Sequence, residues 1–416
     1  MAKRDVIVGL DIGTTKITAV IAQLDGSGGI TIIGVGSSPS DGLRRGVVVN
    51  LQKTVQSIEN AARAAELMAD VDITAAYVGI AGGHIRSINS RGVIAISKPD
   101  SGITRKDVAR VIDAARAVSI PMDREVIHVI PQEYIVDDQA GIKHPIGMCG
   151  VRLEAEVHIV TAAVTSAQNI CKSVRQSGIE VMDLVLEPLA SSYAVLFDDE
   201  KELGVLLLDV GGGTTDVALF YEGSIRETAV IGFGGVNVTN DIALGLSTPI
   251  DEAERIKKQY GCALESMVHD DESISVAGIG GRPSREVPRK SLAGIVEPRM
   301  EEIYTLALRA FRRSDYADVL GAGGGGVVVT GGGALLHGSP ELAERVFGMP
   351  ARLGTPKGVV GLTEMVTNPM HATGIGLILY GVENCTKGRC LSGDVDDIES
   401  ILKRMKEWFK HFWKPQ

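Results

Sequence analysis

Two short segments carry the residue types that phosphate and metal chemistry require. Residues 11–16 read Asp-Ile-Gly-Thr-Thr-Lys, and residues 209–214 read Asp-Val-Gly-Gly-Gly-Thr. Glycine and threonine in a tight turn can direct several backbone N–H groups and hydroxyls at one anion. An aspartate facing the same anion needs a bridging cation, which predicts Mg²⁺ held by Asp11 and Asp209 through water. The predicted phosphate contacts are Gly13, Thr14, Thr15, Lys16, Gly211, Gly212, Gly213 and Thr214.

Apolar stretches on both sides must position these turns. Residues 8–20 and 206–219 both read as a strand, a Gly/Thr turn and a second strand, which predicts two β-hairpins. One such turn would more often be an ordinary turn. Two of them at equivalent positions of two halves indicate a duplicated chain.

A third glycine-rich element follows later in the sequence. The apolar strand 327–330 ends in Gly331, Gly332 and Gly333 and leads toward a helical pattern at 342–347. Glycines at this position permit a ligand to approach the backbone closely. A strand-to-helix connection without a ligand is an equally good interpretation of this element alone.

In this order and spacing, the three elements resemble the two phosphate motifs and the adenosine motif of the actin, Hsp70 and sugar-kinase superfamily. The resemblance implies an α/β fold of two duplicated ribonuclease-H-like domains that close on ATP. It implies Glu187 as an acid near the attacking water, with Asp11 and Asp209, in at most a weak ATPase. Glu254 and Lys257 match an adenine-side helix, although a solvated helix face is the alternative. The further implied ATP contacts are Gly234, Gly235, Gly331, Gly332 and Gly333.

Three stretches narrow the resemblance to one family. Residues 84–92, 128–134 and 150–155 resemble the FtsA family of bacterial cell-division proteins, and the similarity runs from Val6 to Gly381. Strand and helix patterns between the predicted strands 75–80 and 154–160 indicate a small inserted α/β module. The predicted organisation is a first actin-like domain at 1–83 and 154–200, the inserted module at 84–153, a second actin-like domain at 201–382 with an outer lobe at about 235–315, a flexible linker at 383–395 and an amphipathic helix at 396–416.

Charge and composition exclude several classes of protein. The chain has 52 acidic and 42 basic residues, and a net charge of -10 argues against nucleic-acid binding over its surface. The N-terminus lacks the pattern of a secretory signal, and apolar runs are too short for a membrane-spanning helix. Five cysteines, an odd number, fit reduced cytosolic thiols better than a disulfide framework. We therefore expect a cytoplasmic protein.

The C-terminal residues predict a membrane contact. Both tryptophans lie within the last nine residues of a chain that is only 4% aromatic. Helical spacing places apolar and basic residues on opposite faces, which is typical of a helix bound to an anionic membrane surface. A terminal helix docked on its own domain is the alternative. The predicted membrane residues are Ile401, Leu402, Met405, Trp408, Phe409, Phe412 and Trp413, with Lys403, Arg404, Lys406 and Lys410 toward the headgroups.

The family resemblance implies the partners. An FtsA-like protein would bind ATP, polymerise on the cytoplasmic face of the bacterial inner membrane at midcell, anchor the FtsZ ring and recruit later division proteins through the inserted module. The C-terminal peptide of FtsZ would lie near Arg289, Lys290 and Arg299, unless these residues form a solvated helix surface.

Two alternatives of the same superfamily stay open at this stage. A sugar or acetate kinase would need substrate-recognition residues that do not stand out, and a pilus-assembly ATP-binding protein would leave the Trp-rich tail unexplained. An Hsp70-like chaperone would need a β-rich substrate domain after residue 381.

Overall fold

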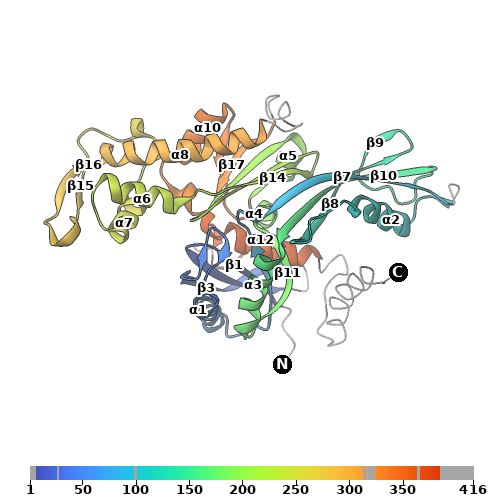
Figure 1. Cartoon of the computed structure of the whole chain (residues 1–416), viewed down its shortest axis with the longest axis horizontal. Coiled ribbons are helices and arrows are strands. Elements are labelled where there is room, and N and C mark those ends of the chain that lie inside the picture. The colour runs from blue at the N-terminus through green and yellow to red at the C-terminus, as the bar shows by residue number, and fades with distance from the viewer. Residues whose placement is uncertain are drawn as a thin grey trace.

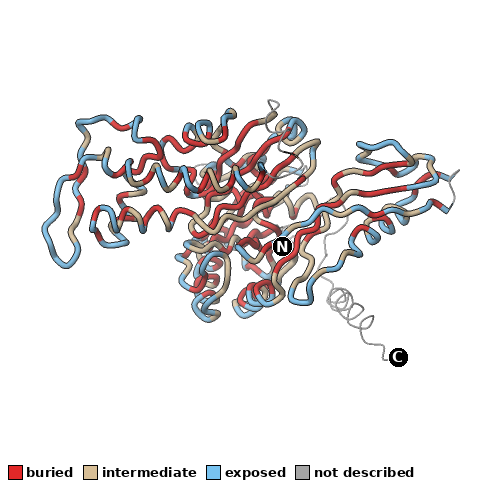
Figure 2. The backbone as a smooth tube through the Cα atoms, turned by 45° about the horizontal axis from the view of Figure 1, so that its top comes forward, coloured by how far each residue is buried: buried red, intermediate tan, exposed pale blue. Residues whose placement is uncertain are grey.

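The computed structural model describes residues 6–25, 28–97, 101–312, 316, 324–362 and 366–384. Two five-stranded sheets form the body, the inserted module extends to one side, and an outer lobe extends to the other (Figure 1). Buried backbone concentrates in the body, whereas the ends of both extensions are largely exposed (Figure 2). The buried body therefore positions the site that lies between the two sheets.

The first sheet is built around the first predicted hairpin. Its strand order is β11-β6-β1-β2-β3, with β1 and β2 antiparallel and Ile12 opposite Ile17. Helix α1 begins after Asn50, whose side chain accepts a hydrogen bond from the Lys53 N–H at 3.1 Å. The elements are β1 (Val6–Ile12), β2 (Lys16–Leu24), β3 (Ile30–Pro39), α1 (Leu51–Ala69), β6 (Ala75–Ile80), α3 (Val164–Gln176) and β11 (Glu180–Leu186), with the short pair β4 (Leu43–Arg44) and β5 (Val47–Val48).

The second sheet repeats this topology. Its order is β18-β17-β12-β13-β14, so an antiparallel β12–β13–β14 unit corresponds to β1–β2–β3 and the parallel strands β17 and β18 correspond to β6 and β11. The predicted duplication is therefore confirmed, and the fold is the expected actin-like α/β architecture. The elements are β12 (Val205–Val210), β13 (Thr215–Tyr221), β14 (Ser224–Ile231), β17 (Gly326–Thr330), a 3₁₀ turn at Gly332–Leu335, α10 (Ser339–Phe347) and β18 (Ala351–Leu353), preceded by α5 (Asp198–Leu203).

Two helices join the halves at the centre. Helix α4 (Glu187–Val195) and helix α12 (Ala372–Asn384) lie between the sheets, and a 3₁₀ turn (Pro369–His371) leads into α12 (Figure 1). They pack so closely that a Cβ built on Gly376 would overlap with the carbonyl oxygen of Ala190. The close contact places the start of both helices beside the hairpin tips.

The inserted module is a four-stranded sheet of order β7-β10-β8-β9 with one helix. Thr104 caps that helix, in a capping box with Asp107. Strand 152–163 pairs with β7 and β8, so our placement of residues 154–160 in the first actin-like domain was wrong. Strand β10 has an apolar run typical of a core strand, because it is buried on both faces over most of its length. The elements are β7 (Arg86–Ala95), α2 (Arg105–Arg116), β8 (Arg124–Val136), β9 (Gln139–Ile142) and β10 (Arg152–Ala163).

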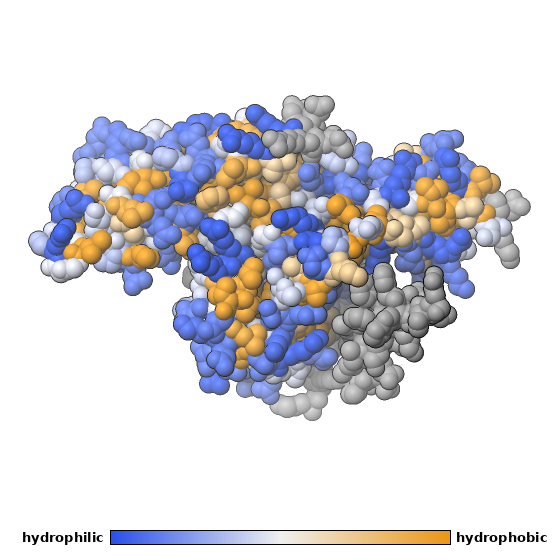
Figure 3. Space-filling view, viewed as in Figure 1, coloured by the Kyte–Doolittle hydropathy of each residue, from blue (hydrophilic) through white to orange (hydrophobic). Residues whose placement is uncertain are grey.

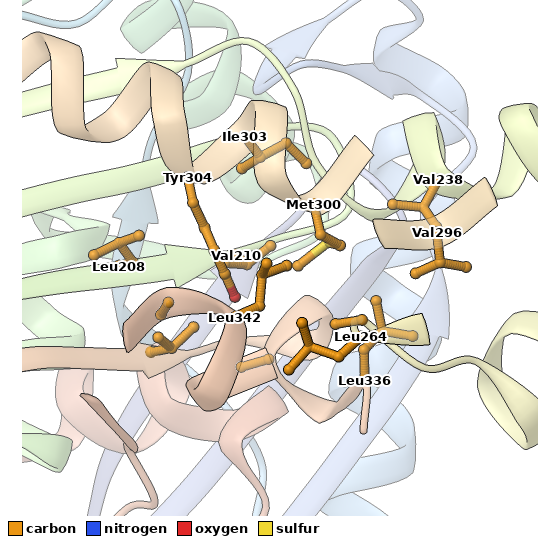
Figure 4. Packing of buried hydrophobic residues seen from close by; sticks show 14 of the residues in the cluster. Leu208, Val210, Val238, Leu264, Val296, Met300, Ile303, Tyr304, Leu336 and Leu342 are labelled. Carbon is orange, nitrogen blue, oxygen red and sulfur yellow. The ribbon is translucent and has the colours of Figure 1, made fainter. Parts of the chain in front are cut away.

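The outer lobe is attached to the second sheet by a long helix. In Figure 4, Tyr304 of that helix points toward Val210 and Leu342, and the Tyr304 hydroxyl is 2.6 Å from the Ser339 hydroxyl. The elements are α6 (Gly235–Gly245), α7 (Ile250–Tyr260), β15 (Ser273–Val276), β16 (Arg285–Pro288) and α8 (Arg289–Phe311), with 3₁₀ turns at Glu265–Met267 and Ile279–Gly281. Within the described ranges, no helix is long and apolar enough to cross a membrane.

Candidate functional site

The tips of the two hairpins meet across one cavity. Each tip is closed by the same hydrogen bond: the Gly13 N–H donates to the Lys16 carbonyl and the Gly211 N–H donates to the Thr214 carbonyl, both at 3.0 Å. A Cβ on Gly213 would lie 2.6 Å from the Thr14 hydroxyl oxygen, and one on Gly212 would overlap with the Thr15 hydroxyl. Only glycine therefore permits the second tip to pack against the threonines of the first.

The cavity between the tips has a volume of about 120 Å³. Pockets for whole small-molecule ligands are usually about 300 Å³ or larger, so this volume matches the phosphate part of a nucleotide better than a whole nucleotide. The predicted site residues that line the cavity are Asp11, Gly13, Thr14, Thr15, Lys16, Glu187, Asp209, Gly211, Gly212, Gly213, Thr214, Gly331 and Gly332.

The third glycine element reaches the cavity from β17. Strand β17 runs parallel to β12 and places Thr330 opposite Asp209. Gly331 has a φ of 83° and touches the Asp209 carboxylate, so a side chain at this position would be strained and would also collide. Gly333 packs instead against Val210 and does not line the cavity.

The predicted adenine-side residues lie next to the cavity but do not line it. The Gly235 N–H donates to the Gly211 carbonyl at 2.9 Å, which fixes the start of α6 against the second tip. The Lys257 ammonium is 2.7 Å from Glu254 and donates to the Gly235 carbonyl at 3.0 Å. With its side chain 12% exposed, Lys257 is not a solvated helix residue. Gly234 completes this contact, because a Cβ there would lie 2.6 Å from the Gly211 carbonyl oxygen.

Four carboxyl groups surround the cavity: Asp209 and Asp216 are buried, and Asp11 and Glu187 are half-buried. Burial, opposed by Lys16 and reinforced by Asp209, raises the pKa of Asp11 to about 7. Burial and the nearby Asp209 also raise the pKa of Asp216 to about 7. The pKa of Glu187 is raised well above its ordinary value by burial and by the other three acids. Negative charge on this cluster is unfavourable unless a cation accompanies it.

Asp216 was not among the predicted residues. It lies directly opposite Asp209 in the hairpin register, where the first hairpin has Thr18 opposite Asp11. Its Oδ2 accepts a hydrogen bond from the Thr214 hydroxyl at 3.0 Å, whereas its buried Oδ1 has no partner among the described residues. Asp216 stands two residues after Thr214, where the second tip ends, so this acid could have been recognised in the sequence.

The acids alone do not make a metal site. In the described part of the chain, no three His, Cys, Asp or Glu side chains converge closely enough to hold an ion. The unpartnered Asp216 oxygen and the glycine cradle nevertheless fit a cation that arrives with phosphate oxygens and water.

The predicted peptide-binding cations are paired within the outer lobe. Arg299 donates to both carboxylate oxygens of Asp241, at 2.5 and 3.1 Å, and it also contacts Glu302. Arg289 is 2.5 Å from Glu272, and Lys290 is 2.7 Å from Asp270. Ten residues along a helix separate Arg289 from Arg299 by roughly 15 Å, so these cations do not converge on one point.

The predicted membrane residues lie outside the described residues, as does the whole 396–416 helix and all but the first two residues of the 383–395 linker.

Comparison with known proteins identifies the family. A family model described as "Cell division protein FtsA" matches residues 206–376, and one described as "SHS2 domain inserted in FTSA" matches residues 82–161. The FtsA protein of Pseudomonas aeruginosa is 50% identical over 408 residues, which cover 97% of both chains. The chain belongs to the FtsA family of cell division proteins. The Escherichia coli FtsA is 40% identical over 98% of both chains, and the Bacillus subtilis FtsA is 38% identical over 92% of this chain and 85% of the other.

Solved structures support the actin-like fold of this FtsA-family chain. The PilM-PilN type IV pilus biogenesis complex gives a TM-score of 0.64 at 16% identity, covering 90% of this chain and 98% of the other. MreB5 of Spiroplasma citri bound to AMPPNP gives 0.57 at 14% identity, covering 92% and 98%. The near full-length FtsA similarity favours cell division over the kinase and pilus-assembly alternatives. The SHS2 match extends through most of β10, in agreement with its pairing in the inserted module.

Proposed function

We propose that this chain binds ATP with Mg²⁺ between its two halves and serves as an actin-like scaffold of bacterial cell division. The observation that carries the proposal is the convergence of both hairpin tips and Gly331 on one acid-lined cavity. Membership of the FtsA family supports the role in division. The nucleotide would hold the halves together and so select one shape of the scaffold.

Each part of the cavity has a task toward the nucleotide. The tips 13–16 and 211–214 would hold the phosphates through N–H groups, hydroxyls and Lys16, and Gly331 and Gly332 would allow the nucleotide to approach β17. Bound Mg²⁺ would neutralise part of the phosphate charge, with Asp11 and Asp209 orienting its water ligands. The adenine side would lie toward Gly234, Gly235, Glu254 and Lys257, with Gly333 supporting the turn.

The residues that line the cavity favour nucleotide binding over ATP hydrolysis. Glu187 is the candidate for orienting an attacking water, but it packs against Gly79 and shares the cavity with three other acids. Among the described residues that line this cavity there is no histidine to act as a separate base. We therefore propose at most slow ATP hydrolysis, with Glu187, Asp11 and Asp209 as the acids involved.

Equilibrium binding of Mg·ATP to the full chain tests this site. We expect one nucleotide per chain and a large loss of Mg²⁺-dependent affinity in Asp209→Ala. Asp113→Asn, on the exposed face of α2, is the matched acid control and should bind normally. Unchanged affinity in a folded Asp209→Ala protein would place the nucleotide elsewhere.

The membrane role rests on the C-terminal sequence. We propose that residues 396–416 form an amphipathic helix on the cytoplasmic face of the inner membrane at midcell, joined through the linker 383–395. Its aromatic residues would enter the interface, and its lysines would meet anionic headgroups. At the membrane, the scaffold would anchor FtsZ by its C-terminal peptide.

We further propose that the chain assembles into head-to-tail filaments and that the inserted module supplies a contact, both to the next copy and to later division proteins. Exposed Val93, Ile146 and Val151 lie on this module, and Figure 3 shows apolar residues gathered on its surface. A folded, ATP-bound protein without the module should form no filaments on lipid. Unaltered filaments would remove the module from the contact.

A further inference from the structure

One oxygen of the Asp209 carboxylate is held by two hydroxyls from outside its own sheet. The Ser191 hydroxyl donates to Asp209 Oδ2 at 2.6 Å, and the Thr373 hydroxyl donates to the same oxygen at 3.2 Å. The two hydroxyl oxygens are 3.1 Å apart, so the three side chains form a closed triangle. All three residues are buried.

The hydroxyls come from the two helices that join the halves. Ser191 lies on α4 and Thr373 is the second residue of α12, whereas Asp209 lies on β12 of the second sheet. The triangle therefore fixes a cavity-lining carboxylate relative to both linking helices. A shift of the second sheet against these helices would have to break it.

The triangle leaves the other carboxylate oxygen, Oδ1, beside Gly331, which lines the cavity. Asp209 Oδ1 lies against the bare Cα of Gly331, where no side chain could fit. Asp216 repeats the arrangement, with Oδ2 held by Thr214 and Oδ1 without a partner among the described residues. In both acids a hydroxyl fixes one oxygen, and the second is available to a ligand.

We propose that Ser191 and Thr373 are positioning residues. They orient Asp209 toward the cation accompanying bound nucleotide and hold β12 in place against α4 and α12. This inference rests on the proposed nucleotide site. Hydrogen bonds to a charged carboxylate are stronger than those between neutral groups, so each hydroxyl restricts the rotation of Asp209. The prediction concerns the Mg²⁺-dependent part of binding, because both hydroxyls donate to the Asp209 carboxylate.

The test measures ADP affinity of the full chain by titration calorimetry in Mg²⁺ and in EDTA. In the wild type, the ratio of the two affinities reports the contribution of the cation. Ser191→Ala and Thr373→Val should lower that ratio roughly ten-fold, with little change in EDTA. Thr373→Ser keeps the hydroxyl and should retain the wild-type ratio. A purely packing role would instead make the ratio depend on side-chain volume, which Thr373→Val keeps and Thr373→Ser does not.

Ser192 provides the matched control. It is buried next to Ser191 on α4, but its hydroxyl donates to the Leu189 carbonyl of its own helix at 2.7 Å. Ser192→Ala should therefore leave the ratio unchanged. An unchanged ratio in Thr373→Val, or an equal loss in Thr373→Ser, would overturn the positioning role while wild-type binding still upheld the nucleotide site. Absence of ADP binding to the wild type would instead overturn the proposed function.

Discussion

Gly331 lies directly against Asp209, so that a Cβ at position 331 would overlap with the Oδ1 atom of that carboxylate. The backbone there also has a φ of 83°, which L-residues with side chains rarely adopt. The third glycine element and the second hairpin are thereby fixed to one another at the cavity. This relationship makes position 331 sensitive to any added side chain.

Gly331→Ala should abolish measurable nucleotide binding and lower the free energy of unfolding by about 1–3 kcal/mol, because it adds both strain and a collision. Gly348→Ala is the matched control, since Gly348 has a φ of 70° but no neighbouring atom within 4 Å of a built Cβ. The control should lose a little stability and keep full affinity. Equal affinity of both variants would show that Gly331 does not adjoin the nucleotide. Urea unfolding and equilibrium binding provide the measurements.

Asp216→Asn should stabilise the nucleotide-free protein, and increasingly so as the pH rises. The folded-state pKa of Asp216 is about 7, above its ordinary value of 3.8, so the native state holds this proton more tightly than the unfolded state. The resulting stability is present at low pH and is lost as the pH rises from about 4 through 7.

Melting temperatures of wild type and Asp216→Asn between pH 5 and 8, without nucleotide, measure this effect. The variant's advantage should be small at pH 5 and largest at pH 8. Asparagine still accepts the Thr214 hydrogen bond, so packing is conserved. A difference that is flat with pH would mean that the charge of Asp216 is already compensated.

Binding of the FtsZ C-terminal peptide should distinguish Lys290 from Arg299, two of the three predicted cations of the outer lobe. Lys290 is 43% exposed and pairs with Asp270, which is 87% exposed, and such pairs contribute only about 0–1 kcal/mol. Lys290→Glu should thus weaken peptide binding with little change in melting temperature. Arg299→Glu places a like charge beside Asp241 and should destabilise the lobe as well as weaken binding. Peptide affinity that survives both substitutions would mean that the peptide binds at another place.

Flotation with anionic vesicles tests the membrane helix. Burial of each large aromatic side chain contributes about 1.5–3 kcal/mol before ordering costs, and each lysine near the surface adds about 1 kcal/mol. Trp408→Glu, or truncation after Gly393, should leave a folded nucleotide-binding protein that no longer floats, whereas Trp408→Phe should float. Flotation of the truncated chain at the level of the full chain would mean that the helix is not the anchor.

Much of the site could be read from the sequence because its glycines and acids follow one another along the chain. The hairpins at 11–16 and 209–214 needed only a local pattern, and their repetition predicted the two sheets. Ser191 and Thr373 could not be found in this way, since 182 residues separate them and ordinary helical patterns surround them. Their role appears only when α4 and α12 meet beside β12.

The inserted module shows a second limit of sequence reasoning. Strand β10 has the apolar run of a core strand, and only its hydrogen-bonded partners reveal which sheet it joins. The ion pair of Arg299 was also hidden from sequence reasoning. The sequence shows a cation at this position, but the Asp241 carboxylate that neutralises it lies 58 residues away along the chain.

Hydrogen exchange at the two hairpin tips tests the central claim, that both halves close on one nucleotide. On addition of Mg·ATP to the full chain, amides of residues 13–16 and 211–214 should gain protection together, at the same nucleotide concentration. Asp209→Ala should abolish the gain at both tips. Protection confined to one tip, or absent from both despite bound ATP, would contradict the account.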